Sequence, residues 1–381
     1  MAEIICFDKG GRDARRTLIG EGRAPRDFFY GILELQERGY DIDQVSSAAP
    51  YSGQIGRLHR LVESASSRLT HVGLRPHFVS VIQPQMQEAR VAMSFTDGFS
   101  LTLGHYYRNI RAGAPYLIGC FHGLSDFEFK MPTLLRPFLT RVIRRALQRL
   151  DHVAFFGPAD RQFGIERYGL QPERTSIILF GVDTRFWTPG EALSEDFIFS
   201  VGQDPSRDFD TLIRAEVEVQ VRLHTALPII VPPARSNVVL TSGSYRHGKL
   251  TDVELRDLYR RSLAVVVPLK DVYQPTGYSV TLQAMACGKP VVLSRIRGLW
   301  APELLIDGEN CLLVEPGNAE ALATAIKRLA ADPELCRRLG KAARETVERH
   351  FSVAQSAAST EALIQRGLRA TTDSGGPARR S

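Results

Sequence analysis

A glycine turn that opens a short helix is the part of this sequence best suited to hold an anion. The stretch Tyr273–Pro290 reads YQPTGYSVTLQAMACGKP, in which Gly277 precedes a helical pattern that ends before Pro290. The first N–H groups of such a helix point outward, and the helix dipole favours negative charge there. We therefore predict a phosphate at Gly277–Val280. An ordinary α/β packing unit would show the same pattern, because a short glycine motif is a weak signal.

The composition is typical of a globular protein with two domains. The chain has 381 residues, of which 44% are hydrophobic and 24% charged. No apolar run approaches the ~20 residues that span a bilayer, and the first residues are unlike a signal peptide. The five cysteines lack C-x-x-C spacing, which argues against a zinc site or disulfide framework and favours the cytoplasm. The net charge of +6 permits phosphorylated ligands, membranes or nucleic acid without choosing among them.

Strand and helix patterns alternate in both halves and predict an α/β fold with parallel sheets. The loop after the first strand lacks G-x-G-x-x-G, so a dinucleotide fingerprint is absent. Helices are expected at Phe28–Arg38 and over 51–72, and helix caps at Thr251 and Asn318. The strands that we expect are Glu3–Phe7, Val91–Phe95, Tyr116–Phe121, His152–Phe156, Ser176–Phe180, Phe197–Gly202, Leu227–Val231, Val238–Leu240, Leu263–Pro268, Val291–Ser294 and Cys311–Val314.

Residues 133–150 form the clearest helical pattern of the first half. An apolar stripe runs from Leu135 and Phe138 to Leu150, and no acidic residue interrupts the segment. A surface helix whose apolar stripe faces the sheet would have this pattern. A basic amphipathic helix that contacts an anionic membrane, through Arg141, Arg144 and Arg145, is the alternative.

The segment GVDTRFWTPG, rich in turn residues, marks the boundary between the domains. We expect an N-terminal domain over 1–180 and a C-terminal domain over 190–350. A further helix, 351–368, should pack back on the N-terminal domain. The small and polar tail 371–381 is expected to be disordered.

Several segments together resemble glycosyltransferase family 4, the group 1 glycosyltransferases. They are AMACGKPVV, GLWAPELLIDGENCLLVEPGNAEALATAIKRL, FGVDTRFWTP and FSVGQDPSRDFDTLIRA. The likeness is strong over about 176–352 and only thematic over 1–175. It implies the GT-B fold, in which two Rossmann-like domains with parallel sheets face a central cleft. It also implies a retaining hexosyltransferase that uses a nucleotide-diphosphate sugar, bound by the C-terminal domain, and that needs neither a metal nor a cofactor.

The family signature of two glutamates, eight positions apart, is altered in this sequence. Gln283 stands at the second glutamate and Pro275 at the first, with Gln274 one residue before it. A glutamine amide can still hydrogen-bond two hydroxyls but supplies no charge, so the resemblance implies ribose binding at Gln283. Gln203 replaces the usual arginine, and Cys311 replaces a usual glycine.

Transfer from such a donor requires that the leaving diphosphate be neutralised and the sugar held in place. For the diphosphate we select Arg207, Lys249 and the turn residues Gly277, Tyr278, Ser279 and Val280. Arg207 follows a strand, where ligands of α/β folds bind, although a surface arginine paired with Asp208 or Asp210 is the alternative. Ser279 is alternatively a helix cap.

Three further residues are candidates for catalysis. His122 follows the strand Tyr116–Phe121 and is placed to contact the sugar or the phosphate, or else it bonds only to backbone. Asp97 ends a strand at a turn and is placed to act as a base on the acceptor. Gln274 is the candidate for the role of the first glutamate.

The leading hypothesis is therefore a cytoplasmic glycosyltransferase, placed at the inner face of the membrane if 133–150 binds lipid. Its acceptor would be a glycan, a lipid or a small molecule. One alternative is a catalytically degenerate nucleotide-sugar-binding protein of a glycan-assembly complex, which Gln203, Gln274 and Gln283 suggest. Another is a GT-B nucleotide-sugar epimerase. Nucleic acid is disfavoured as a partner, because basic and aromatic residues do not interleave. The donor base, the sugar, the acceptor and the oligomeric state are left open.

Overall fold

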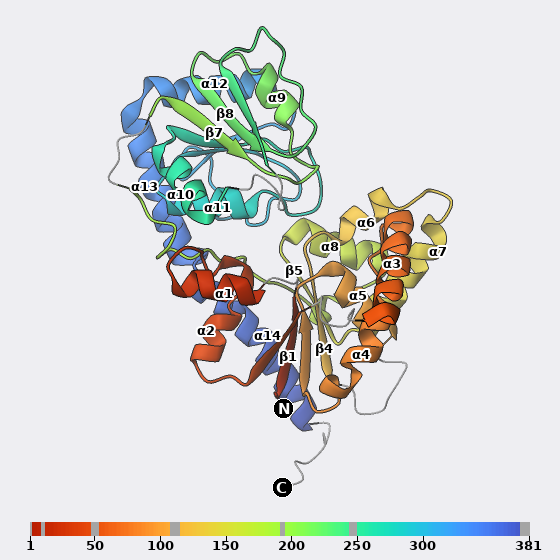
Figure 1. The fold of residues 1–381 in the computed structure, drawn as a ribbon. Helices are drawn as coiled ribbons and strands as arrows, with labels where there is room; N and C mark the ends of the chain where they lie inside the picture. The colour runs from red at the N-terminus through yellow and green to blue at the C-terminus, as the bar shows by residue number, and fades with distance from the viewer. Residues whose placement is uncertain are drawn as a thin grey trace. The chain divides into compact units, whose positions relative to one another are not determined.

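The computed structural model describes residues 2–8, 12–46, 53–106, 115–190, 195–243 and 250–373. The chain divides into two compact units. Each unit is built on a six-stranded sheet whose pairings are all parallel (Figure 1), so the predicted α/β class is confirmed. Unit 1 comprises Met1–Arg16, Ile32–Leu179 and Ala357–Ser381, and unit 2 comprises Thr17–Gly31 and Phe180–Ser356.

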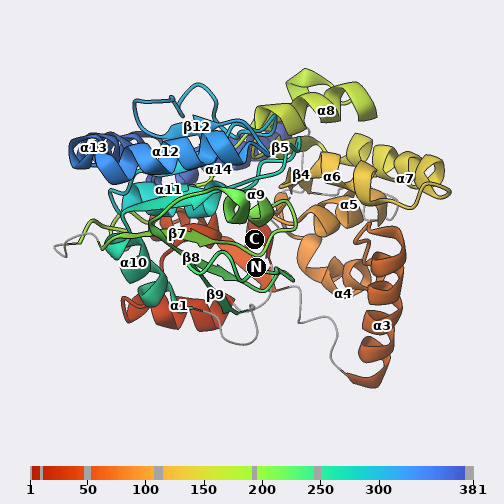
Figure 2. The same ribbon diagram turned by 90° about the horizontal axis from the view of Figure 1, so that it is seen from above.

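The sheet of unit 1 has the order β2-β1-β3-β4-β5-β6. Helices cover both of its faces, with α2 and α14 on one and α4, α5 and α7 on the other (Figures 1 and 2). The strands are β1 (Ile4–Asp8), β2 (Ile42–Ser46), β3 (Val91–Ser94), β4 (Tyr116–Phe121), β5 (His152–Phe155) and β6 (Thr175–Ile177). The helices are α1 (Arg12–Gly20), which continues into unit 2, α2 (Ile32–Glu37), α3 (Gly53–Thr70), α4 (Pro76–Met86), α5 (Asp97–Tyr106), α6 (Leu124–Lys130), α7 (Arg136–Arg149), α8 (Pro158–Tyr168) and α14 (Val353–Asp373).

Close helix packing supports the middle of this sheet. All residues of β3 and β5 are buried, as expected for strands covered on both faces. A Cβ added to Gly104 of α5 would lie 2.2 Å from the carbonyl oxygen of Ala146 in α7. Only glycine allows these helices to approach so closely, and their contact buries Leu147 and Leu150.

The sheet of unit 2 has the order β12-β11-β10-β7-β8-β9, with α9 and α12 on one face and α10 and α11 on the other (Figure 1). The predicted caps are confirmed, because the Thr251 hydroxyl accepts from the Glu254 N–H and Asn318 accepts from the Ala321 N–H. The strands are β7 (Phe197–Val201), β8 (Gln220–Thr225), β9 (Val238–Ser242), β10 (Ala264–Val267), β11 (Val291–Ser294) and β12 (Leu312–Val314). The helices are α9 (Phe209–Arg214), α10 (Asp252–Arg261), α11 (Tyr278–Ala286), α12 (Ala319–Ala331) and α13 (Pro333–His350).

Two predicted elements are wrong. The strand expected at Leu227–Val231 is irregular chain, because Pro228 interrupts it and prolines at 232 and 233 follow it. The strand of this region is β8 instead. The helix expected from Phe28 begins only at Ile32. Tyr30 and Gly31 have φ angles of 51° and 82°, which stop the preceding short 3-10 turn, Asp27–Phe29.

Residues Thr17–Gly31 belong to unit 2, although they lie near the start of the chain. The rings of Phe28 and Tyr30 pack against Phe180, with centroid distances of 5.5 and 6.0 Å. The domains predicted from the sequence are continuous segments of the chain, whereas each of the two compact units is made of several segments. The predicted boundaries remain predictions.

Helix α7 differs from the expectation at its start. Leu135 and Phe138 are exposed, and the apolar stripe of 133–150 enters the core only from Leu139 onwards. The expectation that the whole stripe faces the sheet is therefore wrong at this end, and contact of the segment with a membrane remains a prediction. None of the described helices is both long enough and apolar enough to cross a membrane.

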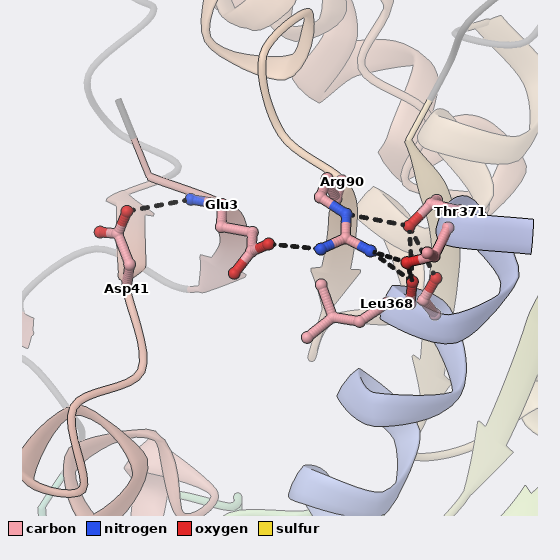
Figure 3. Close-up of polar contacts among 7 residues, drawn as sticks. Glu3, Asp41, Arg90, Leu368 and Thr371 are labelled. Carbon is pink, nitrogen blue, oxygen red and sulfur yellow. Dashed lines mark hydrogen bonds and ion pairs between the residues drawn. The ribbon is translucent and has the colours of Figure 1, made fainter. Parts of the chain in front are cut away.

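Arg90 fastens the last turn of α14 to the sheet of unit 1 (Figure 3). Its guanidinium donates to the Leu368 carbonyl oxygen, to the Thr371 hydroxyl at 3.2 Å and to the Glu3 carboxylate. The tail was expected to be disordered from 371, but this contact keeps the helix regular to Asp373. Residues 374–381 lie outside the described part of the chain.

Replacing Arg90 with alanine should loosen the end of α14, because one charged hydrogen-bonding group holds several acceptors there. Losing about 1 kcal/mol of local stability would accelerate amide exchange roughly fivefold over residues 368–373. Hydrogen–deuterium exchange measures this. Arg38→Ala, which removes an ion pair to Glu361 on the same helix, is the matched control and should leave 368–373 unchanged. Equal acceleration in both variants would contradict the role given to Arg90.

Candidate functional site

The strand order of unit 2 reverses between β7 and β10, which is the topological switch point of the sheet. Along the chain β7 is followed by β8 and β9 on one side, whereas β10 is followed by β11 and β12 on the other. The loops that leave the carboxyl ends of β7 and β10 therefore turn apart. Ligands of open α/β sheets bind in the crevice at such a point. These two loops, residues 202–208 and 268–277, contain or adjoin most of the donor-site residues predicted from the sequence.

Hydrogen bonds join the two loops to each other. The N–H of Asp208 donates to the Pro268 oxygen at 3.0 Å. The N–H of Lys270 donates to the Ser206 oxygen at 2.8 Å. The hydroxyls of Ser206 and Thr276 lie 3.0 Å apart, and both residues are buried. Because of these bonds, the loop after β7 and the chain entering α11 have a fixed relative position.

Gly277 is the N-cap of α11, and a larger residue at this position would be strained. Its φ is 78°, and an added Cβ would lie 3.0 Å from Cγ1 of Val267 and 3.1 Å from Cδ1 of Leu269. Because Gly277 has no side chain, the N-cap residue cannot accept a side-chain hydrogen bond from the first N–H groups of α11. The first turn of α11 also contains no acidic residue. This end of the helix therefore retains the positive field that favours an anion.

Arg207 contributes positive charge beside that helix end. It forms a bridge with Leu269, and an added Cβ on Gly202 would lie 2.3 Å from its Nε. The residue is only 6% exposed, so the alternative of a surface arginine is wrong. Asp208, offered as its partner, caps α9 by accepting from the Thr211 N–H. A guanidinium in this setting acts through a lower dielectric than a surface charge does.

The other turn residues are held around the same helix end. The ring of Tyr278 lies 4.8 Å from Phe180 and 6.2 Å from Trp300. Ser279 is the second residue of α11, so the alternative that it caps the helix is wrong, because Gly277 occupies that position. Gln274 is partly buried, and an added Cβ on Gly298 would lie 2.3 Å from its carbonyl oxygen.

Gln283 lies on the buried side of α11 and is bound to Asp27. Its Nε2 donates to Asp27 Oδ2 at 2.9 Å, and its Oε1 lies 3.4 Å from the Tyr259 hydroxyl. The indole N–H of Trp187 donates to the same Oδ2 at 2.8 Å, and the N–H of Asp183 donates to Oδ1 at 2.7 Å. The residue at the second signature position thus forms part of a buried network with a carboxylate that lies 256 residues away in the sequence.

Burial raises the pKa of Asp27 to about 7, because the charged carboxylate is withdrawn from water. The hydrogen bonds from Asp183, Gln283 and Trp187 oppose this rise by stabilising the ionised form. A second carboxylate at position 283 would face Asp27 directly. The amide at 283 is therefore the residue that this network requires, and sequence reasoning missed Asp27 because no local pattern connects it with α11.

Two other departures from the family pattern also have structural roles. The amide of Gln203 donates to the Gly243 oxygen and accepts from the Ala226 N–H, both at 2.7 Å. Gln203 therefore braces the loops that follow β7, β8 and β9. Cys311 is fully buried, and burial raises the pKa of its thiol to about 12. Gln203 is thus held by the internal hydrogen bonds of unit 2, and Cys311 lies in its interior.

The structure brings His122 and Asp97 together in unit 1. The Asp97 carboxylate accepts from the backbone N–H of His122 at 2.7 Å. Asp97 is the first residue of α5, so the turn expected at this position is the start of a helix. The His122 ring stacks on Phe156 at 4.2 Å, with its Nε2 3.0 Å from the Phe95 oxygen. These contacts orient the imidazole at the carboxyl edge of β3 and β4. The catalytic roles given to both residues remain predictions.

Lys249 lies outside the described residues. Within the described ranges, no group of three or more His, Cys, Asp and Glu side chains is arranged to hold a metal ion. The ribose contact predicted for Gln283 and the catalytic role predicted for Gln274 remain predictions.

Comparison with known proteins finds a family match in the second half of the chain. Residues 244–346 match the family described as Glycosyl transferases group 1. The α-maltose-1-phosphate synthase of Mycolicibacterium smegmatis is 29% identical over 252 residues, which cover 58% of this chain and 64% of that protein. The chain thus spans less than two thirds of the length of the first curated relatives that it matches.

Solved structures show the same fold over nearly the whole chain. Sucrose-phosphate synthase from Thermosynechococcus elongatus has a TM-score of 0.69 at 19% identity and covers 97% of this chain and 100% of that one. The HepE protein of Anabaena, in complex with UDP and glucose, has a TM-score of 0.66 at 16% identity and covers 96% and 100%. The expected GT-B fold is confirmed.

Gln283→Glu, the change towards the family residue, should destabilise unit 2. It places two carboxylates in a buried contact, at a cost of about 2–4 kcal/mol at pH 8. The double variant Asp27→Asn/Gln283→Glu restores one carboxylate and one amide and should recover part of that loss. Tryptophan fluorescence during urea unfolding reports on unit 2, because both tryptophans of the chain, Trp187 and Trp300, lie there. Additive losses in the double variant would show that the two residues are not coupled.

The pH dependence of stability should identify Asp27 directly. Its pKa is higher in the folded state than in the unfolded chain, so its contribution to stability is complete below pH 3.8 and is lost as pH rises through about 7. Wild-type protein should therefore lose stability relative to Asp27→Asn between pH 5 and 8. Urea midpoints at several pH values measure the difference. A constant difference over that range would contradict the raised pKa.

Proposed function

We propose that this chain, which has the GT-B fold and carries a group 1 glycosyl transferase domain in residues 244–346, transfers a sugar from a nucleotide-diphosphate donor. The observation that carries the proposal is that the buried Arg207 is bridged to Leu269, which also contacts Gly277 at the N-terminus of α11, at the point where the strand order of unit 2 reverses. The curated relatives of the chain are glycosyltransferases. We further propose that the anomeric configuration is retained, as in the family.

The chemistry requires that negative charge be neutralised as the donor breaks. The bond between the anomeric carbon and the β-phosphate oxygen breaks, a bond from the acceptor oxygen to that carbon forms, and the acceptor hydroxyl gives its proton to a base, for which Asp97 is the candidate. Arg207 and the N–H groups at Gly277–Val280 would stabilise the departing diphosphate, which gains charge in the transition state. A buried guanidinium and a helix end are fixed in advance, so they need not reorganise during the reaction.

The other contacts to the donor and acceptor are proposed from the places of the residues in the sequence and in the fold. The Tyr278 ring and the Ser279 hydroxyl adjoin the turn, and Lys249 would add a further cation to the diphosphate. Gln283 would contact the ribose through an amide that Asp27 already orients. His122 would contact the sugar or phosphate, and Asp97 or Gln274 would assist at the reacting centre. The HepE structure contains UDP and glucose, which supports a uridine nucleotide as the first donor to test.

The acceptor and the compartment belong to the same proposal. A glycan, a lipid-linked sugar or a small molecule would accept the sugar. All cysteines of the chain are free thiols, four of them buried, which fits the reducing cytoplasm. We therefore place the reaction in the cytoplasm.

A catalytically degenerate nucleotide-sugar-binding protein is the second candidate. The observation that favours it is the engagement of both glutamines, Gln203 and Gln283, in the internal hydrogen bonds of unit 2. Neither amide replaces the charge of the family residue. Gly277 and Arg207 would then serve binding alone.

A donor panel separates the two candidates. Purified protein is incubated with UDP-, GDP-, dTDP- and ADP-sugars, with and without an extract that contains acceptors, and the free nucleotide diphosphate is measured. Release that depends on the acceptor supports transfer. Tight binding of one nucleotide without turnover on any acceptor fraction would reject the enzyme and support the binding protein.

Arg207→Ala should weaken binding of the matching nucleoside diphosphate by about 1.5–3 kcal/mol, the scale of a charged hydrogen bond. Titration calorimetry measures the dissociation constant, and a thermal melt confirms that the variant is folded. Arg328→Ala is the matched control, because it removes the same charge from the exposed side of α12 in the same unit. An unchanged dissociation constant in Arg207→Ala would refute its contact with phosphate.

A further inference from the structure

Trp300 buries a hydrogen-bond donor that has no acceptor among the residues described by the structure. Its side chain is 4% exposed, and its indole Nε1 has no hydrogen-bond partner in those parts of the chain. A buried tryptophan N–H usually finds an acceptor, because an unpaired donor that is withdrawn from water costs free energy. The N–H of Trp300 therefore calls for an acceptor that the described chain does not supply.

The other tryptophan of the chain shows the usual arrangement. Trp187 is fully buried in the same unit, and its indole N–H donates to Asp27 Oδ2 at 2.8 Å. The two tryptophans are thus similar in burial and differ in the partner of the N–H. Packing alone does not explain tryptophan at position 300, because a phenylalanine ring would occupy an apolar space without burying a donor.

The loop that carries Trp300 is in backbone contact with the loop that enters α11. This loop, residues 295–301, follows β11. The N–H of Gly298 donates to the Val272 oxygen at 2.7 Å. A Cβ added to Gly298 would lie 2.3 Å from the carbonyl oxygen of Gln274. Only glycine allows the two loops to approach so closely.

The side chain of Arg297 completes the contact between these loops. Its Nε donates to Asp271 Oδ2 and its backbone N–H donates to Asp271 Oδ1, both at 2.9 Å. The guanidinium also lies 4.2 Å from the centroid of the Tyr273 ring. Trp300 therefore has a fixed position relative to the chain that enters α11.

The ring of Trp300 reaches the N-terminus of α11. Its centroid lies 6.2 Å from that of Tyr278, the first residue of the helix, and the two rings are inclined by 72°. The phosphate site proposed at Gly277–Val280 includes the same residue. In the sheet, β10 lies between β7 and β11. A donor at this helix end would therefore have Arg207, from the loop after β7, on one side and Trp300, from the loop after β11, on the other.

We propose that the indole N–H of Trp300 donates a hydrogen bond to an oxygen of the sugar donor, on the diphosphate or on the sugar attached to it. The inference rests on the proposed function, because it places the nucleotide-diphosphate sugar at the same helix end. An indole N–H is a donor only, and phosphate and hydroxyl oxygens both accept from it. A ligand that lacks this oxygen would leave the N–H unpaired, so Trp300 also contributes to specificity.

Nuclear magnetic resonance of the full-length chain, labelled with ¹⁵N-tryptophan, tests the proposal. The chain gives two indole N–H signals, which Trp187→Phe and Trp300→Phe assign. The probes are UDP, GDP, dTDP and ADP and their sugar derivatives, and the tightest-binding pair is used. On saturation the Trp300 proton should move downfield, as a new hydrogen bond requires, while the Trp187 proton keeps its position. A shift with the diphosphate alone assigns the acceptor to phosphate, and a shift only with the nucleotide sugar assigns it to the sugar.

Trp300→Phe supplies a second readout, because it keeps an aromatic ring and removes the N–H. It should bind the nucleotide sugar at least about fivefold more weakly than the wild type does. Trp187→Phe is the matched comparison for stability, since it removes the same atoms and also breaks the bond to Asp27. Urea unfolding without nucleotide, followed by circular dichroism, should therefore show a smaller loss in Trp300→Phe than in Trp187→Phe.

Two results would overturn this inference and leave the proposed function intact. One is saturating nucleotide-sugar binding that Arg207→Ala weakens but that leaves the Trp300 signal in place. The other is unchanged affinity in Trp300→Phe. Failure of every nucleotide and nucleotide sugar of the panel to bind the wild type would instead reject the proposed function, and the contact of Trp300 with it.

Discussion

The carboxylate of Asp27 in the interior of unit 2 is the contact on which the arrangement of this unit depends. It accepts from the Asp183 N–H, the Trp187 indole and the Gln283 amide. It thereby joins the early segment Thr17–Gly31 to the chain that enters unit 2 and to α11. An uncompensated buried carboxylate would cost several kcal/mol, so each of these donors is needed.

A second polar contact continues this network on the far side of α11. The guanidinium of Arg344 in α13 donates to the carbonyl oxygens of Trp187 and Ala286, both at 2.6 Å, and to that of Thr184 at 3.0 Å. It therefore ties the end of α11 to the same chain segment that holds Asp27. With Gln283 and the C-terminal end of α11 both bound, the position of the helix is fixed, as preorganised anion binding at its N-terminus requires.

The sequence predicted what local patterns determine. The glycine turn before α11, the caps of α10 and α12, and the buried strands β10 and β11 follow from residue types within a few positions. The strand β8 was missed because QVRLHT alternates weakly and a more apolar segment follows it. That segment, Leu227–Val231, contains Pro228 and is followed by two further prolines, which exclude a regular strand.

Long-range contacts account for what the sequence could not predict. Gln283 was interpreted from the family pattern alone, since no periodicity relates it to Asp27. The inward carboxylate of Glu63 likewise depends on the His77 amide of the neighbouring helix, so the orientation of α3 could not be read from its own sequence. In both cases a buried polar group found its partner through the tertiary fold.

Amide hydrogen–deuterium exchange with and without a nucleoside diphosphate tests the central claim most directly. With UDP, or with whichever diphosphate binds, the account predicts slowed exchange in the loop 202–208 and at residues 277–280. It predicts no change in exchange at the edge strand β12 or in the helix α12. Saturating binding with protection at that edge, and with none in 202–208 and 277–280, would contradict a donor site at the point where the strand order of the sheet reverses.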